Sequence, residues 1–404
     1  MRVKIDKGRA RGCVTAPPSK SVAHRLLIAA AMCEGESTVR GISTCDDVVA
    51  TIECLNALGV SVKREASDAR VTGKSFLHAK PTRALDCQES GSTARFIIPP
   101  VMLSGNEATL VGRGRLLSRP MSVYEDVFSE KGLFFSHGAD RIDIKGPLSG
   151  GEYEIFGGVS SQFISGLIFA LPLTKEDSKI KITPPFESRP YVELTLEAIR
   201  KFGVCAYWED EHTIMIPGKQ RYIPTDVTVE GDFSGAAFID ALNLFGGEVE
   251  LLGLNPDSLQ ADAIYKKHFA ALSRGACEIN LSDCPDLAPI LFAVSAAKQG
   301  ARFTGTARLR IKESDRCEAM ATELKKFGAN VDVYENEVIV SPALLHKPSE
   351  PLFGHNDHRI VMSLAVLLTH LGGEIIGAEA VAKSYPDFFD DLRALGIGAY
   401  EYDA

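Results

Sequence analysis

The chain has 404 residues, of which 45% are hydrophobic and 24% are charged, a balance typical of a soluble globular protein. This length exceeds what one ordinary core holds, so we expect two domains of roughly 200 residues each. The net charge of −9 argues against a nucleic-acid or membrane-surface partner, because either would favour a broad basic face.

The start of the chain and its cysteines indicate a compartment. Residues 1–12 are basic and lack the apolar core of a signal peptide, and no apolar run of about 18 residues occurs. The nine cysteines are scattered without a C-x-x-C pair, a pattern typical of reduced thiols. We therefore expect a cytoplasmic protein without a targeting segment.

An internal repeat runs along the chain. A helical stretch that ends in glycine and enters a β-like run recurs with a period of about 70 residues, at Gly59, Gly132, Gly203, Gly275, Gly328 and Gly396. Glycine is expected just past a helix end, where the backbone takes a positive φ. Between these turns lies a second helix-like run, over residues 22–33, 93–103, 162–171, 233–245, 286–297 and 357–371.

The repeats predict how the chain divides. Short β-branched runs such as 213–216 and 338–340 fill the gaps, giving each repeat two helices and about four strands. We expect two bodies of three repeats each: an N-terminal lobe over 16–230, and a C-terminal lobe over 1–15 plus 231–404. The opening strand, Val3 to Thr15, is then free to pair with the second body, and the chain crosses between bodies twice.

Several helix starts in the first half carry cations and hydroxyl groups. Lys20 and Ser21 open the helix that contains Arg25, and Gly91 opens the one that contains Arg95. Capping explains serines and prolines at such places, but it does not require the cations. Without a Cβ, glycine lets an anion approach backbone N–H groups closely. Further hydroxyl, amide and guanidinium groups suited to phosphate and carboxylate oxygens follow at Arg119, Ser160, Ser161, Gln162, Ser188 and Tyr191.

The densest charge cluster lies at residues 310–316, where three cations and two carboxylates precede a helical pattern over 318–327. One such cluster alone is also compatible with a solvated, ion-paired helix start. The cations add up to more than one phosphate of about −1.5 to −2 would need: Lys20, Arg25, Arg95, Arg119, Lys312, Arg316, Arg359 and Lys383. If they converge, the ligands must be strongly anionic.

Proton-transfer groups stand among these cations. Asp286 and Glu313 are carboxylates, and Lys20 and His358 are further proton carriers. Nearby cations would lower the carboxylate pKa values and burial would raise them, so the roles of acid and base stay open. Salt bridges are the alternative interpretation. The spacing of His355 and His358 also fits a metal site, but the adjacent Arg359 would repel a cation.

Taken together, six motifs resemble those of the 5-enolpyruvylshikimate-3-phosphate synthase family, in order and spacing over nearly the whole chain. They are Pro18-Ser19-Lys20-Ser21 with Arg25, Gly91-Ser92-Thr93-Ala94-Arg95, Val159-Ser160-Ser161-Gln162-Phe163, Ile311-Lys312-Glu313-Ser314-Asp315-Arg316, Asn356-Asp357-His358-Arg359, and Lys383. Each motif alone is weak, and jointly they are specific.

The resemblance implies an α/β enolpyruvyl transferase fold of two domains, each with three βαβαββ units in an inside-out α/β barrel, closing on substrate. It implies transfer of the enolpyruvyl group of phosphoenolpyruvate to the 5-hydroxyl of shikimate 3-phosphate, with release of phosphate. The reaction is an addition–elimination through a tetrahedral intermediate, in the shikimate pathway of aromatic amino-acid biosynthesis. No metal or organic cofactor is implied, and we expect a monomer.

The resemblance also implies residue roles. The residues implied for shikimate 3-phosphate are Ser21, Arg25, Ser160, Ser161, Ser188, Tyr191, Asp286 and Lys312. Those implied for phosphoenolpyruvate are Lys20, Gly91, Arg119, Gln162, Arg316, Arg359 and Lys383. Asp286 would handle the hydroxyl proton, and Glu313 with Lys20 the proton traffic at the methylene. Two phosphates and two carboxylates carry about five to six negative charges, which accounts for the surplus of cations.

Some positions depart from the family pattern. Arg308 and Glu89 stand where many members have asparagine, so we carry over no ligand contact to either. Ser92 replaces a common threonine and keeps the hydroxyl.

Two alternatives remain. UDP-N-acetylglucosamine enolpyruvyl transferase has the same fold and donor, but it usually carries a reactive cysteine in the loop corresponding to residues 112–118, where this chain has none. A non-catalytic anion-binding protein would gain little from carboxylates such as Asp286 and Glu313 beside its ligands.

Overall fold

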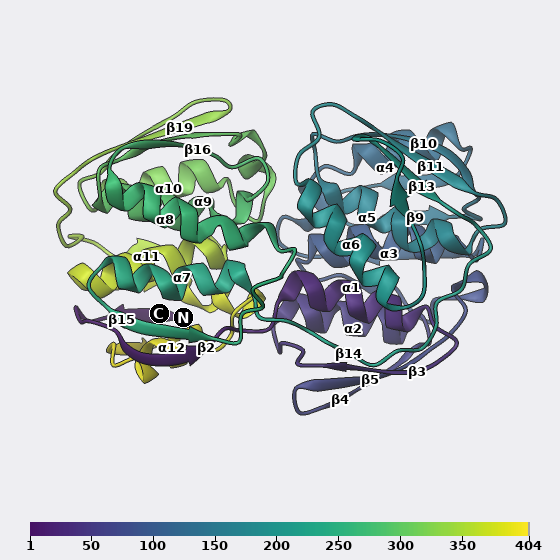
Figure 1. The fold of residues 1–404 in the computed structure, drawn as a ribbon, viewed down its shortest axis with the longest axis horizontal. Coiled ribbons are helices and arrows are strands. Elements are labelled where there is room, and N and C mark those ends of the chain that lie inside the picture. Colours follow the sequence, from purple (N-terminus) through teal and green to yellow (C-terminus); the bar gives the residue numbers. More distant parts are fainter. Residues whose placement is uncertain (403–404) are drawn as a thin grey trace. The chain divides into compact units, whose positions relative to one another are not determined.

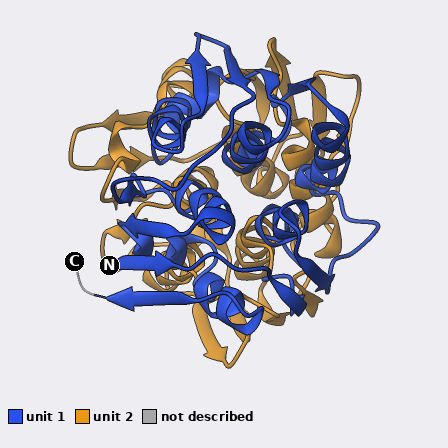
Figure 2. Cartoon of the chain, turned by 90° about the vertical axis from the view of Figure 1, so that its left-hand side faces the viewer, with its two compact units in different colours: residues 1–17, 231–404 blue, residues 18–230 orange. Residues whose placement is uncertain are grey.

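The computed structural model describes residues 1–402 and divides into two compact units (Figure 2). Unit 1 contains residues 1–17 and the chain from residue 231 onward, and unit 2 contains residues 18–230. The first crossing thus falls two residues later than the boundary expected from the sequence. In unit 1 the Asp232 amide donates to the Pro17 carbonyl oxygen at 2.7 Å, and in unit 2 the Ser19 amide donates to that of Glu230 at 2.8 Å.

Unit 2 contains three four-stranded sheets and their helices (Figure 1). Its helices are α1 (Lys20–Ala31), α2 (Asp46–Ala57), α3 (Gly91–Met102), α4 (Ser122–Glu130), α5 (Ser161–Ala170) and α6 (Arg189–Lys201). Its first sheet contains β14 (Val227–Thr228), β3 (Gly35–Arg40), β5 (Asp68–Gly73) and β4 (Ser61–Glu65). The second contains β6 (Leu85–Asp86), β7 (Glu107–Val111), β9 (Ile142–Lys145) and β8 (Phe134–His137). The third contains β10 (Gly151–Phe156), β11 (Ser178–Thr183), β13 (Thr213–Ile216) and β12 (Tyr207–Trp208).

Unit 1 repeats this plan. Its helices are α7 (Phe233–Leu244), α8 (Tyr265–Arg274), α9 (Ala288–Ala297), α10 (Arg316–Lys325), α11 (His358–Leu371) and α12 (Phe388–Ala394). One sheet contains β16 (Cys277–Asn280), β17 (Ala301–Thr304), β19 (Glu337–Ser341) and β18 (Asn330–Val333). Another contains β20 (Leu352–Phe353), β21 (Gly373–Ile376), β1 (Arg2–Ile5) and β22 (Ala399–Tyr402), and a two-stranded sheet pairs β15 (Glu248–Leu252) with β2 (Arg11–Thr15).

The four-stranded sheets share one pattern, a parallel pair followed by antiparallel strands. In the second sheet of unit 2, β6 runs parallel to β7, and β9 lies antiparallel between β7 and β8. The opening segment of the chain supplies strands to unit 1, where β1 pairs with β21 and β22 and β2 runs parallel to β15. Conversely β14, just before the second crossing, runs parallel to β3 in unit 2. The two crossings therefore exchange the first strands of two repeats.

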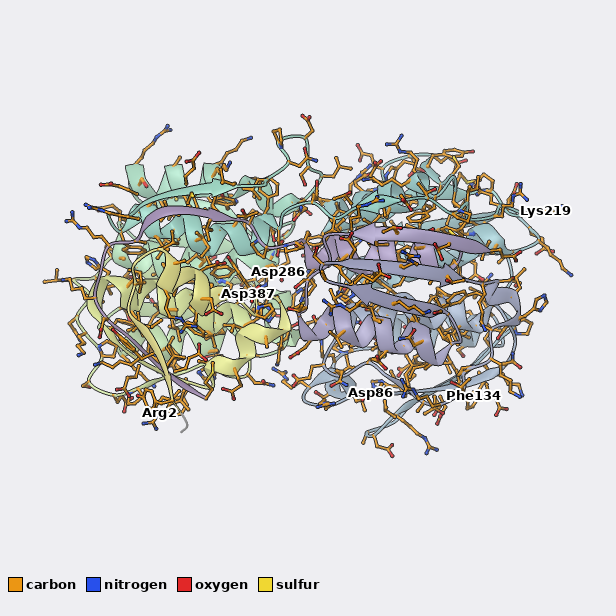
Figure 3. All side chains as sticks on the ribbon, turned by 90° about the horizontal axis from the view of Figure 1, so that it is seen from below. Arg2, Asp86, Phe134, Lys219, Asp286 and Asp387 are labelled. Atoms are coloured by element: carbon orange, nitrogen blue, oxygen red, sulfur yellow. The ribbon has the colours of Figure 1, made fainter. Side chains whose placement is uncertain are left out.

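Three helices of each unit are buried over most of their length and form its core, with mainly apolar side chains, as expected for helices that are covered all round. In unit 2 these are α1, α3 and α5, and in unit 1 they are α7, α9 and α11. The second helix of each repeat and the sheets cover them (Figure 1). Charged side chains spread over the outside of the units, where Figure 3 marks Lys219. No helix in residues 1–402 is long and apolar enough to cross a membrane.

Four helices, α1, α3, α5 and α10, begin one or two residues earlier than apolar periodicity predicts, α7 begins where predicted, and α9 and α11 begin two residues and one residue later. Ser19, Ser90 and Ser160 each accept a backbone N–H of the following turn and so extend α1, α3 and α5 toward the N-terminus. Likewise Asp315 caps α10, which starts at Arg316 rather than at Glu318. The glycine turns occur as expected, with φ between 65° and 88° at five of the six positions and 157° at Gly275. Residues predicted to precede the helices therefore lie in their first turns.

A proline inside α3 sets how α5 packs on it. Pro99 has no N–H to donate to the Arg95 carbonyl oxygen four residues earlier, and the Tyr124 hydroxyl donates to that oxygen instead, at 2.7 Å. Gly166 of α5 lies against the same place, where an added Cβ would come within 2.4 Å of that oxygen. The missing side chain thus lets the two central helices approach closely.

Candidate active site

The central helices of unit 2 present N-terminal turns without acidic residues. The first turns of α1, α3 and α5 contain no Asp or Glu, whereas those of α2 and α4 do. The N-terminus of a helix carries roughly half a positive charge, which an acidic side chain in the first turn would offset. Uncompensated helix starts of this kind favour anions.

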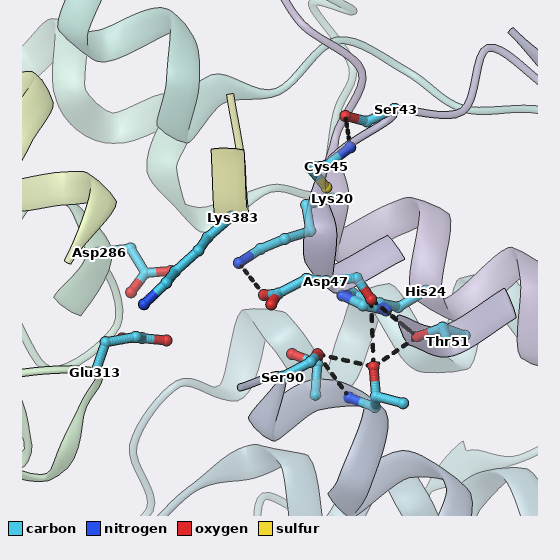
Figure 4. A network of polar contacts seen from close by, with 12 residues as sticks. Lys20, His24, Ser43, Cys45, Asp47, Thr51, Ser90, Asp286, Glu313 and Lys383 are labelled. Carbon is cyan, nitrogen blue, oxygen red and sulfur yellow. Dashed lines mark hydrogen bonds and ion pairs between the residues drawn. The ribbon is translucent and has the colours of Figure 1, made fainter. Parts of the chain in front are cut away.

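Lys20, at the first position of α1, is held by an aspartate. Its Nζ lies 2.7 Å from Oδ2 of Asp47 in the first turn of α2, and both side chains are about one-tenth exposed (Figure 4). Ser21 follows Lys20, and its carbonyl oxygen accepts from the Arg25 guanidinium. The ammonium is therefore fixed in direction while part of it stays accessible.

Arg25 is 2% exposed and is held by neutral groups. Its Nε donates to Thr195 Oγ1 at 2.8 Å, its Nη1 to the Ser21 carbonyl oxygen at 2.7 Å, and its Nη2 to that of Tyr191 at 2.9 Å. Burial lowers the pKa of Arg25 to about 10, and its charge remains in full at neutral pH. A positive charge held by dipoles alone is ready to attract an anion.

Gln162 joins the starts of α3 and α5. Its Oε1 accepts from Arg95 Nη1 at 2.8 Å, and its Nε2 donates to Ser92 Oγ at 2.9 Å. Gly91 opens α3 against Arg119, whose guanidinium atoms lie 2.8 to 3.0 Å from the place a Cβ would take. The starts of α3 and α5 thus bring together four residues predicted from the sequence: Gly91, Arg95, Arg119 and Gln162.

The other predicted residues of unit 2 lie at the starts of α5 and α6. Ser160 is the N-cap of α5, Ser161 is its first residue, and Ser188 precedes α6 in a left-handed conformation with φ of 59°. Tyr191, in the first turn of α6, is tied to Arg25 through its carbonyl oxygen. The structure therefore brings Arg25 and Tyr191 together.

In unit 1, Arg316 is the centre of the charge cluster and is 1% exposed. Its Nε donates to Oδ2 of Asp357, its Nη1 to Oδ1 of Asp286 and its Nη2 to Oε2 of Glu313, each at 2.9 Å. Arg359 Nη2 donates to the other oxygen of Asp286, also at 2.9 Å. Arg316 and Arg359, both predicted ligands of phosphoenolpyruvate, therefore bind the carboxylate of Asp286, the predicted acid/base group.

Electrostatics in this cluster keep Asp286 ionised. Partial burial acts to raise the pKa of Asp286, but the charges of Arg359, Lys312 and Arg316 outweigh it, and the pKa lies well below its usual value. Burial lowers the pKa of Lys312 to about 8. The Asp286 side chain is 20% exposed and that of Glu313 15%, so a ligand can reach both.

Lys383 and His358 complete the predicted set. The Lys383 ammonium donates to the Asn356 carbonyl oxygen at 2.6 Å, and Figure 4 shows it pointing toward Asp286 and Glu313. His358 is 1% exposed at the first position of α11, beside Asp357. The backbone before this helix takes positive φ at His355 (51°) and Asn356 (53°). His355 is paired with Glu323, with its Nε2 2.9 Å from Oε1 of that carboxylate.

Sequence reasoning missed several partners of these residues. Asp47 holds Lys20, Thr195 holds Arg25, and Asp357 holds Arg316. Asp262 is also buried, and its pKa is raised to about 7, chiefly by burial and then by Asp286. Asp357 stands inside a quoted motif and could have been singled out. Asp47 could not, because an acidic residue in a first helical turn is ordinary.

Comparison with known proteins identifies relatives over the whole chain. The family model described as EPSP synthase (3-phosphoshikimate 1-carboxyvinyltransferase) matches residues 5–392. A 3-phosphoshikimate 1-carboxyvinyltransferase of Clostridium perfringens is 39% identical over 98% of this chain and 98% of that protein. One from Clostridium kluyveri is 38% identical over 98% of this chain and 97% of that protein.

A solved structure has the same fold. The EPSP synthase of Acinetobacter baumannii superimposes with a TM-score of 0.79 at 23% sequence identity, covering 99% of this chain and all of that one. This likeness confirms the two-domain α/β fold that the resemblance implied for this chain.

Proposed function

The chain belongs to the EPSP synthase family. We propose that two groups of residues carry out enolpyruvyl transfer: the polar residues at the helix starts of unit 2, and the charge cluster around Arg316 in unit 1. The reaction transfers the enolpyruvyl group of phosphoenolpyruvate to the 5-hydroxyl of shikimate 3-phosphate in aromatic amino-acid biosynthesis. The hydroxyl oxygen bonds to the central carbon of phosphoenolpyruvate while the methylene gains a proton. The tetrahedral intermediate then loses that proton and phosphate.

Shikimate 3-phosphate is assigned mainly to unit 2. Arg25 supplies a buried charge held by neutral partners, and the uncompensated helix starts at Ser160 and Ser161 add backbone N–H groups. Ser21, Ser188 and Tyr191 lie at the neighbouring helix starts. From unit 1, Lys312 and Asp286 are assigned to the same acceptor.

Phosphoenolpyruvate is assigned to cations of both units, together with the Gly91 backbone and the Gln162 amide. Lys20, Gly91, Arg119 and Gln162 belong to unit 2, and Arg316, Arg359 and Lys383 to unit 1. Preorganised cations around a departing phosphate stabilise the charge that develops as its bond breaks, usually the largest single contribution in such reactions.

The observation that carries this proposal is the placement of Asp286. Its two carboxylate oxygens accept hydrogen bonds from Arg316 and Arg359, the cations assigned to phosphoenolpyruvate. When anionic ligands engage these guanidiniums, their hold on Asp286 weakens and its pKa rises toward a value suited to a base. Asp286 then takes the proton of the attacking hydroxyl. Glu313, with Lys20, handles the methylene proton, and His358 is a further proton carrier.

Neither alternative fits as well. The loop over residues 112–118 has no cysteine of the kind expected for a UDP-N-acetylglucosamine enolpyruvyl transferase. A simple anion binder would be weakened by Asp286 and Glu313, which occupy its cations with the protein's own charges. We further propose that the protein acts as a monomer in the cytoplasm, and light scattering on the purified chain would test the mass.

The test is a phosphate-release assay with purified protein, phosphoenolpyruvate and shikimate 3-phosphate. We expect release that requires both compounds, and none when UDP-N-acetylglucosamine replaces the acceptor. Release at the rate of the blank would favour the anion binder, and release with the nucleotide sugar would favour the other transferase.

A further inference from the structure

We propose that the hydroxyl groups of Thr51 and Thr93 are positioning groups for phosphoenolpyruvate, because they lock the start of α2 to the start of α3. Neither residue is among those assigned above. The inference rests on the proposed function, since it concerns the groups assigned there to phosphoenolpyruvate.

The geometry is a chain of short hydrogen bonds between three helices (Figure 4). His24 Nδ1 of α1 lies 2.7 Å from Thr51 Oγ1 of α2, which lies 2.7 Å from Thr93 Oγ1 of α3. Thr93 Oγ1 lies 2.8 Å from Ser90 Oγ, the N-cap of α3. All four side chains are fully buried. The chain therefore connects the helices where water cannot replace any of its members.

The hydroxyl protons of the chain can be placed in one consistent order. Burial, followed by the charges of Lys20 and Arg25, holds the pKa of His24 well below its usual value, so the ring is neutral. Its tautomer sets whether Nδ1 donates to Thr51 or accepts from it. Because the Thr93 hydroxyl donates to Ser90 Oγ, it accepts from Thr51, and Thr51 in turn accepts from the His24 Nδ1–H. Each threonine hydroxyl therefore donates once and accepts once along the chain. Both threonine hydroxyls are thus satisfied, although His24 Nε2 at the end of the chain is buried without a partner among residues 1–402. Losing one threonine hydroxyl leaves the next member of the chain without a partner.

Each end of the chain adjoins a group assigned to phosphoenolpyruvate. At α3, Ser90 directly precedes Gly91 and accepts the Thr93 backbone N–H at 3.2 Å. At α2, both threonine hydroxyls lie 3.4 Å from the carbonyl oxygen of Asp47, the residue whose carboxylate holds Lys20. The chain thus fixes the distance between the Lys20 ammonium and the Gly91 backbone.

Helix capping alone does not need this arrangement. The Ser90 cap uses the Thr93 backbone N–H, which any residue would supply. The N-cap of α2 is Cys45, which makes no side-chain cap hydrogen bond. The two threonine hydroxyls therefore add a connection between helices beyond what each helix requires by itself.

The experiment compares Thr93→Val, which keeps the shape and removes the hydroxyl, with Thr93→Ser, which keeps the hydroxyl. We expect the valine variant to raise the KM for phosphoenolpyruvate about tenfold and to leave that for shikimate 3-phosphate within about twofold. The serine variant should return the first KM to within about threefold of wild type.

Thr174→Val is the matched control, because Thr174 also has a buried hydroxyl with two carbonyl partners, those of Leu171 and Glu176. It should lower the Tm without changing either KM. Thr51→Val breaks the same chain one member earlier and takes the place of Thr93→Val if the latter does not fold. In a double-mutant cycle the Thr51 and Thr93 effects on KM should be less than multiplicative.

Two results would overturn the inference: a KM for phosphoenolpyruvate within twofold of wild type in Thr93→Val, or equal rises in both KM values that serine does not reverse. Failure of the proposed function looks different, as wild-type protein would then release no phosphate. Calorimetric binding of phosphoenolpyruvate to the same variants still tests the inference in that case, and unchanged affinity would reject it.

Discussion

The two units use one repeat and the same kind of helix start, but they hold their cations differently. In unit 2, Arg25 is bonded to a hydroxyl and two carbonyl oxygens, and Arg95 to an amide and a carbonyl oxygen. In unit 1, Arg316 is bonded to three carboxylates and Arg359 to one of the same three. Arg25 of unit 2 thus keeps its charge available to a ligand, whereas Arg316 and Arg359 of unit 1 are paired with the protein's own carboxylates. Lys20, which is paired with Asp47, is the exception in unit 2.

This difference separates binding from proton transfer. A cation held by dipoles keeps its full attraction for a ligand, whereas a cation held by carboxylates controls the pKa of those carboxylates. The first arrangement suits recognition of phosphate, and the second suits acid/base chemistry that responds when an anion arrives. The comparison predicts which variants lose affinity and which lose turnover.

The largest expected effect is on turnover. Asp286→Asn keeps the shape but removes the base, so kcat should fall by at least about 100-fold. Phosphate release measures it, and a Tm close to that of wild type would exclude unfolding as the cause. Unchanged kcat would remove Asp286 from the mechanism.

The free energy of unfolding should distinguish Arg316 of unit 1 from Arg25 of unit 2. Arg316→Met leaves Asp357, which is fully buried, without its main counter-charge, so unfolding free energy should drop by about 3–5 kcal/mol. Arg25→Met removes a buried charge that no carboxylate compensates among the contacts described above, and it should cost clearly less. Urea unfolding of both variants checks this, and equal losses would contradict the comparison.

Gly91→Ala should act on affinity alone. The new Cβ would displace the Arg119 guanidinium, the far end of a flexible side chain, so stability should change little. The KM for phosphoenolpyruvate should rise about tenfold because the anion loses close approach to the helix start. A KM equal to that of wild type would place the anion elsewhere.

The smallest effect concerns pH. Lys312 has a pKa lowered to about 8 by burial, so it carries a proton below that pH and loses it as the pH rises through 8. The KM for shikimate 3-phosphate should therefore rise a few-fold from pH 7 to pH 9, by loss of one charge. Lys312→Arg keeps its charge over this range and should flatten the profile. A profile of the same shape in both proteins would assign the change to another group.

How far the sequence leads depends on whether a pattern is local. Each of these patterns depends only on a few adjacent residues: the glycine turns, the central helices, and the motifs around Gly91 and Glu313. The structure has the repeat that they predict. The partners are not local: Asp47 lies 27 residues from Lys20, and Thr195 lies 170 from Arg25. Nothing in the sequence distinguishes Asp47 from Asp46, its neighbour in the same helical turn.

The most direct measurement is calorimetric binding of shikimate 3-phosphate and phosphoenolpyruvate to Asp286→Asn and to Arg25→Met. The first variant should bind both compounds without releasing phosphate, and the second should lose most of its affinity for shikimate 3-phosphate. The opposite pattern, with binding lost in Asp286→Asn and kept in Arg25→Met, would contradict the division of labour between the two units.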